Sequence, residues 1–249
     1  MQGKHAATRA TTDGTWEKDD KVQISVKDSA TTFDGVNIDA NGKVILNDIH
    51  FRWKKHYPEK EIYAHYPVEL AKEIMENQSN EGYQKSDYLF ASQIRITISS
   101  SNKEKTLVFR HLPAKVVVHL NAGNGVTEEE LKAATVTFEN LNRKWGKSPD
   151  EETGHIDQVI PGTDRIIPNE VTPAADGYVR TVRALFVPQD MSGRKLVKIV
   201  TAAGKTFYYI PTKGEADFFN GKMYEYRLTV ASVGVTNSTV EGGTWQPAD

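Results

Sequence analysis

The stretch that decides the fold is residues 220–230, Asn220-Gly221-Lys222-Met223-Tyr224-Glu225-Tyr226-Arg227-Leu228-Thr229-Val230. It opens with Asn-Gly, a pair typical of tight turns. Tyr224, Tyr226, Leu228 and Val230 then alternate with polar residues. A period of two places one set of side chains on one face of a strand and the other set in water. The stretch therefore predicts a half-buried antiparallel strand that is entered through a turn.

The same alternation recurs along the chain. Further runs of this kind are residues 22–26, 94–98, 107–109, 116–120, 182–186, 196–200 and 207–210. Asn-Gly and Asp-Gly pairs lie between several of them and can supply the positive φ angles of hairpin turns. Short strands at this spacing predict an all-β fold of antiparallel β-sandwiches with minor helices, rather than alternating β-α units.

Two helices are expected as connectors between strands. The first would begin at Pro67 and run to about Asn77, with apolar residues at 68, 71, 74 and 75 on one face. The second would be short, because Thr127 and Glu130 have capping-box spacing. The long polar stretch 142–176 should contain short strands near 155–160 and 165–167, since a structureless loop of that length is uncommon in a compact domain.

Pro113 interrupts two strand patterns and marks the expected domain boundary. This placement gives a leader or cloning remnant at 1–9, an N-terminal β-sandwich domain at 10–113 and a C-terminal β-sandwich domain at 114–249.

Bulk composition excludes several classes of function. The 249 residues carry 31 basic and 33 acidic side chains, so no single-sign charge favours binding to nucleic acid or to an acidic membrane. Cysteine is absent, which rules out disulfides, thiolate metal sites and cysteine nucleophiles. No apolar run is long enough to cross a bilayer, and no signal peptide is recognisable. Motifs of hydrolases and of nucleotide binding are also missing, so no catalytic residue and no cofactor is predicted.

One stretch has the spacing of a calcium loop. Asn37, Asp39, Asn41 and Asp48 place oxygen ligands at alternate positions before a closing carboxylate. The first ligand is Asn, the last is Asp instead of Glu, and no helix flanks the stretch. A hairpin through Asn41-Gly42 is therefore the favoured interpretation. None of the seven histidines has the close pairing of a metal site, so structural roles are expected for them.

Aromatic residues gather in one region and offer a second hypothesis. Trp53, Tyr57, Tyr63 and Tyr66 could form a platform on which sugar rings stack. Residues 62–66 also alternate as a strand would, so core packing of these rings is the favoured alternative.

Several segments resemble, in the same order, those of the fimbrillin-like family of Bacteroidetes surface proteins. They are Thr8-Arg9-Ala10, Trp16–Val22, Ile62–Pro67, Asp87–Ala91, Leu107–Lys115, Phe186–Gln189 and Tyr224–Val230. The resemblance implies two transthyretin-like β-sandwich domains in an exported lipoprotein of the outer membrane, which is built into pili and contributes to adhesion. It also implies other fimbrial subunits as partners, with a host or bacterial surface receptor as a further one. Contact with the membrane would be only through a lipid anchor, for which this chain has no cysteine.

The resemblance also implies maturation by an arginine-specific protease that removes an N-terminal strand. Arg9, before Ala10, is the candidate cleavage position, and a plain surface residue in a leader is the alternative. A groove left by a missing strand can be filled by an extended segment of a partner. The candidate donor is residues 233–249 with Val235, Val240 and Trp245, and an ordinary last strand is the alternative. The chain is thus predicted to be a non-enzymatic fimbrial subunit, with a surface glycan-binding module as the second hypothesis.

Overall fold

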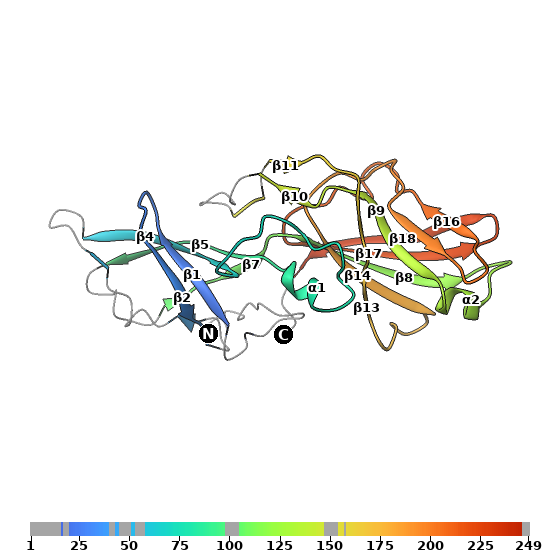
Figure 1. Cartoon of the computed structure of the whole chain (residues 1–249), viewed down its shortest axis with the longest axis horizontal. Coiled ribbons are helices and arrows are strands. Elements are labelled where there is room, and N and C mark those ends of the chain that lie inside the picture. The colour runs from blue at the N-terminus through green and yellow to red at the C-terminus, as the bar shows by residue number, and fades with distance from the viewer. Residues whose placement is uncertain are drawn as a thin grey trace, which may run out of the picture.

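The computed structural model describes residues 16, 20–39, 43–44, 51–52, 58–97, 105–146, 154–156 and 158–245. This part of the chain is an elongated body of β-sheets with two short helices (Figure 1). Its buried apolar side chains gather in one large cluster, one smaller cluster and a third cluster centred on Tyr83, Leu185 and Trp245. The prediction of an all-β chain with minor helices is confirmed.

A five-stranded antiparallel sheet lies at one end of the body and carries the smaller cluster (Figure 1). Its strands, in spatial order, are β2 (Thr32–Asn37), β1 (Lys21–Val26), β4 (Glu59–Tyr66), β5 (Leu89–Thr97) and β7 (Phe109–His111). A separate pair consists of β3 (Lys43–Val44) and β6 (Lys105–Thr106). Val22, Ile24 and Ile62 are fully buried, so alternate residues of β1 and β4 form the core face of the sheet.

Two further sheets contribute to the larger cluster. The first has the order β13 (Asn169–Glu170), β14 (Arg180–Phe186), β8 (Ala114–Ala122), β17 (Lys222–Ala231) and β18 (Gly234–Thr244). The second has the order β12 (Asp164–Ile166), β9 (Thr135–Leu141), β15 (Val197–Val200) and β16 (Thr206–Tyr209). The rings of Phe138 and Phe186, one from each sheet, meet edge to face with centroids 5.0 Å apart.

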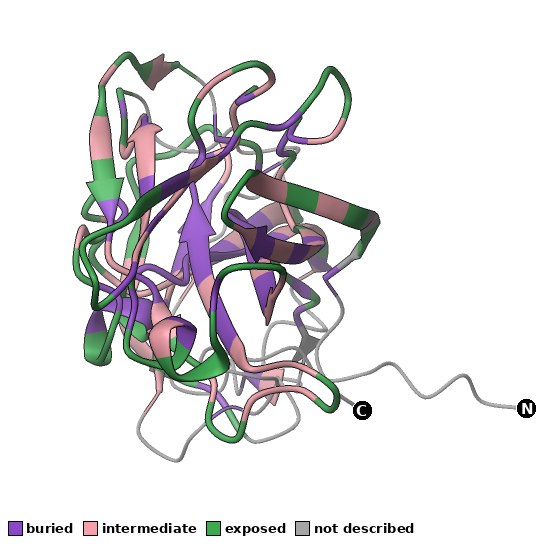
Figure 2. Cartoon of the chain, turned by 90° about the vertical axis from the view of Figure 1, so that its right-hand side faces the viewer, coloured by how far each residue is buried: buried purple, intermediate pink, exposed green. Residues whose placement is uncertain are grey.

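β17 is the strand predicted from residues 220–230. Tyr224, Tyr226, Leu228 and Val230 are buried, and the residues between them are partly exposed. Figure 2 shows, for the chain as a whole, buried residues concentrated on inner strands and exposed ones on the surrounding loops. The turn before the strand needs glycine, because Gly221 has a φ of +63° and a Cβ there would lie 2.9 Å from the carbonyl oxygen of a neighbouring residue. β17 runs antiparallel to β18 and parallel to β8. The half-buried strand is confirmed, and its parallel neighbour is a finding that alternation could not indicate.

The second predicted helix is confirmed. α2 (Glu128–Lys132) begins with a complete capping box, in which the Glu130 N–H donates to Thr127 Oγ1 at 3.1 Å. The Thr127 N–H donates in return to the Glu130 carboxylate at 2.9 Å. Neither helix in the described part of the chain has the length and hydropathy that a membrane span requires.

The first predicted helix, from Pro67 to Asn77, is wrong. The Ile74 N–H donates to Arg143 O at 2.8 Å, and the Ile167 N–H donates to Glu76 O at 2.8 Å. The backbone of this segment thus bonds to distant strands and not to residues four positions away. Ile74 is buried in the larger cluster and Leu70 packs against it, whereas Ala71 and Met75 are exposed. The helix in this region, α1 (Glu81–Lys85), begins after it.

The polar stretch 142–176 contains short strands, as predicted. β10 (Lys144–Trp145) pairs with β11 (Val159–Ile160), and β12 pairs with β9. A domain boundary near Pro113 stays a prediction. Ile74 and Tyr88, which precede it, belong to the larger cluster together with residues that follow it.

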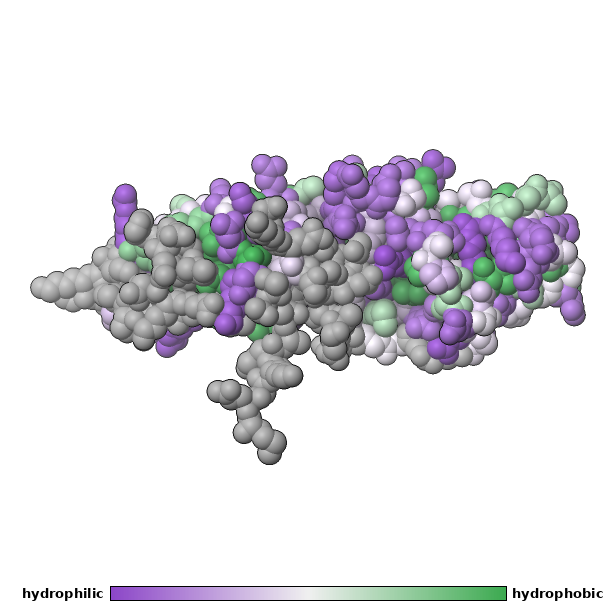
Figure 3. All heavy atoms as spheres, turned by 90° about the horizontal axis from the view of Figure 1, so that it is seen from below, coloured by the Kyte–Doolittle hydropathy of each residue, from purple (hydrophilic) through white to green (hydrophobic). Residues whose placement is uncertain are grey.

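The described part of the face shown in Figure 3 is mainly hydrophilic. On the face shown in Figure 3, hydrophobic residues show only in small groups between hydrophilic ones. A broad apolar face for membrane or partner binding is therefore not a feature of this view.

Candidate functional site

The C-terminal strand β18 lies at the edge of its sheet. It pairs with β17 from Gly234 to Thr244, and in the described chain β17 is its only ladder partner. Val235 and Val240 are half-buried and pack against the larger cluster. The segment predicted to be a donor therefore occupies a place in its own sheet, and its transfer to another subunit stays a prediction.

Trp245 anchors the end of this strand. Its ring stacks on the ring of His111, with centroids 3.4 Å apart and planes inclined by 12°. The Lys115 ammonium lies 5.2 Å from the centroid of the indole, within cation–π range. The backbone N–H of Trp245 donates to Gly221 O at 3.1 Å. We call His111, Lys115 and Gly221 the Trp245 seat.

His111 of the seat also belongs to a buried polar pair. His111 Nδ1 is 2.7 Å from Asp87 Oδ1, and both side chains are almost fully buried. Leu185 and Tyr83 complete the third cluster around Trp245. Loss of the indole would therefore expose apolar surface and let water compete for the histidine–carboxylate hydrogen bond.

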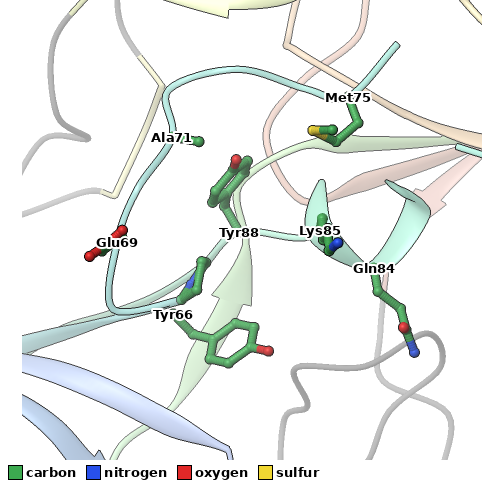
Figure 4. A pocket seen from close by; sticks show the side chains of 8 residues that line it. Tyr66, Glu69, Ala71, Met75, Gln84, Lys85 and Tyr88 are labelled. Atoms are coloured by element: carbon green, nitrogen blue, oxygen red, sulfur yellow. The ribbon is translucent and has the colours of Figure 1, made fainter. Parts of the chain in front are cut away.

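A pocket of about 390 Å³ opens between the end of β4 and α1 (Figure 4). Its lining residues are Tyr66, Pro67, Glu69, Ala71, Met75, Gln84, Lys85 and Tyr88. In Figure 4 the Ala71 methyl group and the Met75 thioether point toward the Tyr88 ring, whereas Glu69 and Gln84 point outward. We call this site the Tyr66–Tyr88 pocket. Its interior is apolar and its mouth is polar.

The two tyrosines of the pocket are held from different clusters. Tyr66 packs against the smaller cluster and meets Trp16 edge to face, with centroids 5.7 Å apart. Tyr88 belongs to the larger cluster, and its hydroxyl donates to Glu73 O at 2.9 Å. Burial, aided by the nearby Glu73 carboxylate, raises the pKa of Tyr88 to about 12. Tyr88 is thus a neutral phenol whose hydroxyl is already used, and with only 1% of the residue exposed it closes the back of the pocket.

The wall that carries Gln84 and Lys85 is fixed by contacts around α1. Gln78 is fully buried, donates to Leu185 O at 2.9 Å and accepts from the Leu185 N–H at 2.8 Å. Gly82 lies so close to the Asn77 carbonyl that a Cβ would come within 1.8 Å of its oxygen. These contacts tie α1 to β14 and set the position of the pocket mouth.

His119 and His65 are held by contacts within the fold. His119 Nδ1 lies 2.9 Å from Thr181 Oγ1, and its Nε2 lies 3.2 Å from Glu225. Burial lowers the pKa of His119, Arg227 adds to this, and Glu225 opposes it. His65 Nδ1 lies 2.9 Å from Pro67 O, and burial lowers its pKa as well. Both rings have both nitrogens occupied by neighbours, so neither offers a free ligand atom.

The calcium hypothesis is only partly within the described residues. The Lys43 N–H donates to the Asp39 carboxylate at 2.9 Å, and the Asp39 N–H donates to Lys43 O at 2.9 Å. These bonds, with the Ile38–Val44 bridge, are those of the alternative hairpin. No group of three or more acidic or histidine residues suited to a metal occurs in the part of the chain that the structure describes. Asn37 lies in β2, and Asn41 and Asp48 lie outside the described residues, so the ion site stays a prediction.

The other predicted site residues divide into two groups. Tyr63 packs against the larger cluster, with its ring 5.8 Å from that of Phe90, whereas Tyr66 lines the pocket. Four residues lie outside the described part of the chain: Arg9, Ala10, Trp53 and Tyr57. Sequence reasoning missed Tyr88, Met75 and α1 as partners of Tyr66, because no local spacing connects them.

Comparisons with known proteins give a consistent result. A family profile described as fimbrillin-like matches residues 8–245. A crystal structure of a candidate cell adhesion protein from Bacteroides uniformis superimposes with a TM-score of 0.68 at 17% identity, over 98% of this chain and 96% of that one. The structure of another such protein, from Bacteroides ovatus, superimposes with a TM-score of 0.63 at 20% identity, over 94% of this chain and 90% of that one. A third, from Bacteroides thetaiotaomicron, superimposes with a TM-score of 0.52 at 17% identity, over 90% of this chain and 85% of that one. No functionally curated protein matches the chain significantly.

Proposed function

The chain belongs to the fimbrillin-like family, and from this premise we propose that it is a structural subunit of a cell-surface fimbria that assembles by strand exchange. The family comprises fimbrial and cell-adhesion proteins that are not enzymes. Division into two transthyretin-like β-sandwich domains near Pro113, export as an outer-membrane lipoprotein and partnership with other fimbrial subunits are parts of the same proposal.

The observation that carries the proposal is the position of β18. The strand lies at a sheet edge, has one ladder partner among the described strands, and ends in the Trp245 seat. Gly242 and Gly243 precede the anchor, are exposed, and have open space where a Cβ would be. An edge strand with one anchoring side chain is the kind of element that can leave its own sheet and add to another.

Exchange between identical subunits conserves the contacts of the strand. Each ladder hydrogen bond contributes about 0.5–1.5 kcal/mol net, and buried apolar area adds about 25 cal/mol per Å². The β18 strand of a second copy would regain the ladder hydrogen bonds along β17 and the apolar burial in the Trp245 seat. The equilibrium between exchanged and unexchanged subunits then depends on subunit concentration and on the geometry of the turn that joins β17 to β18.

Cleavage between Arg9 and Ala10 is the proposed maturation step. Because β1 begins at Lys21, this cut would leave β1 in its sheet, between β2 and β4. Removal of residues 1–9 would therefore leave every described strand of the first sheet in the chain.

The absence of cysteine allows a direct test with the full chain. Met223 and Gly243 face each other in the β17–β18 register. Met223→Cys chains are mixed with Gly243→Cys chains, before and after treatment with an arginine-specific protease, and disulfide-linked dimers are quantified by mass. Exchange predicts cross-linked dimers that accumulate with time and increase after cleavage after Arg9.

A matched control uses Met223→Cys chains with Ala202→Cys chains, since Ala202 is exposed and lies in the turn after β15. This mixture should give only the background of random oxidation. If the Met223/Gly243 mixture gives no more dimer than the control, while the double variant forms its disulfide within one chain, β18 does not exchange and the proposal is wrong.

A further inference from the structure

We propose that the Tyr66–Tyr88 pocket binds one neutral pyranose ring of a surface saccharide. This binding function is distinct from strand exchange, and its test does not require that strand exchange occurs. Of the predicted aromatic platform, Tyr66 lines this pocket, whereas Tyr63 packs against the larger cluster; the platform as a whole stays a prediction.

The size and interior of the pocket suit a small ring. Its volume of about 390 Å³ lies in the range of small-molecule sites, roughly 300–1,000 Å³. The lining is largely apolar: the Ala71 methyl group and the Met75 thioether lie beside the buried Tyr88 ring, and the partly exposed Tyr66 contributes from the end of β4 (Figure 4). Aromatic rings accept the C–H face of a sugar, and a methionine adapts its shape to the guest.

The mouth of the pocket supplies hydrogen-bonding groups that are not otherwise used. Within the described residues, the side chains of Glu69 and Gln84 make no hydrogen bond or ion pair, and both are exposed. A carboxylate accepts hydrogen bonds from hydroxyl groups, and an amide both donates and accepts them. An apolar floor below a polar mouth complements a pyranose, which has an apolar face and a rim of hydroxyl groups.

Charge at the mouth selects against anionic sugars. The Lys85 ammonium donates to the Glu81 carboxylate at 2.9 Å, so its charge is already balanced. Glu69 then leaves the mouth with an uncompensated negative charge. A neutral hexose suits these groups better than an acidic one, and better than a leucine or phenylalanine side chain of a partner, which would partly desolvate Glu69 without bonding to it.

The test is a titration of the full chain with three probes: methyl α-D-mannopyranoside, methyl β-D-galactopyranoside and methyl β-D-glucopyranoside. Binding is followed by saturation-transfer NMR and by chemical shifts of the protein. For a single ring we expect a Kd in the millimolar range, about 1–10 mM, for at least one probe. Ala71→Trp fills the pocket from an exposed position and should weaken binding at least tenfold. Ala202→Trp, at an exposed position elsewhere, should leave it unchanged.

Glu69→Ala and Gln84→Ala are second variants, because both positions are exposed and their loss leaves the core intact. Each should weaken binding several-fold. The proposal is overturned if no glycoside binds at about 50 mM, or if Ala71→Trp binds as the wild type does. It is also overturned if N-acetylphenylalanine amide binds, Ala71→Trp blocks that binding, and none of the glycosides competes with it. The pocket would then be a docking site for a partner's side chain.

Discussion

Replacement of Trp245 by alanine should release β18 from its sheet while the rest of the chain stays folded. The indole is 92% buried, as its exposed fraction is 8%. It stacks on His111, lies below the Lys115 ammonium and closes the third cluster. No other side chain of the described strand end makes a comparable set of contacts.

The expected magnitude follows from the buried area. A buried tryptophan removes about 150–250 Å² from water, which at about 25 cal/mol per Å² corresponds to about 4–6 kcal/mol. Ordering of the side chain and compactness of the unfolded chain reduce this figure to about 3 kcal/mol. Because β18 lies at the sheet edge and pairs with β17 alone among the described strands, the loss should appear first as local detachment. A change of about 3 kcal/mol raises the detached population about 150-fold.

Hydrogen exchange of residues 234–244, measured by mass spectrometry, reports that population directly. In the Trp245→Ala variant the β18 amides should exchange about 100-fold faster or more, while β8 and β14 keep their protection. Trp245→Phe is the matched control, because a smaller ring retains part of the stack on His111. Unchanged exchange of β18 in Trp245→Ala would refute the reasoning, as would uniform loss of protection over all sheets.

Three further predictions concern the stability of the free subunit. Burial lowers the pKa of His119 below its ordinary value of 6.5, so the unfolded chain binds that proton more tightly and the free energy of unfolding should fall as the pH drops below 6.5. Denaturant unfolding at several pH values should show a smaller fall in the free energy of unfolding for His119→Asn than for the wild type. An equal pH dependence in the two proteins would contradict the assignment of this effect to His119. Gly82→Ala should destabilise by about 3 kcal/mol, because the new methyl group meets a backbone carbonyl. Gly242→Ala, which enters open space, should change stability by less than about 0.5 kcal/mol, and equal thermal midpoints for the two would contradict this. Gln78→Leu leaves the Leu185 N–H and carbonyl without their partner and should cost about 3 kcal/mol in the same unfolding assay, whereas a stability equal to wild type would show that the amide bridge is replaceable.

Elements with strong local signals could be predicted from the sequence. Alternation specified the burial of β17, and the Thr127–Glu130 spacing specified the start of α2, because both depend on residues a few positions apart. The direction of β8 beside β17 could not be predicted, since alternation is the same for parallel and antiparallel neighbours.

The segment after Pro67 shows why local patterns fail elsewhere. Its apolar residues have helical spacing, but its backbone donors and acceptors are used by Arg143 and Ile167 from distant parts of the chain. Tertiary hydrogen bonds thus outweigh helical preference, which contributes little per residue. The same long-range contacts bring Tyr66 and Tyr88 together, so the pocket could not be found by spacing, although Tyr66 was among the predicted aromatic residues.

The strand end and the pocket share a structural element, and this makes them interdependent. Tyr83 of α1 belongs to the third cluster with Trp245, and the next two residues, Gln84 and Lys85, line the pocket mouth. When Trp245 leaves its seat, Tyr83 loses a packing partner and the mouth of the pocket loses part of its support. Any effect of strand release on ligand affinity must be matched by an equal effect of the ligand on strand release, because coupling between two binding equilibria is reciprocal. A subunit whose seat is filled, by its own strand or by a neighbour's, would therefore be the form that binds best.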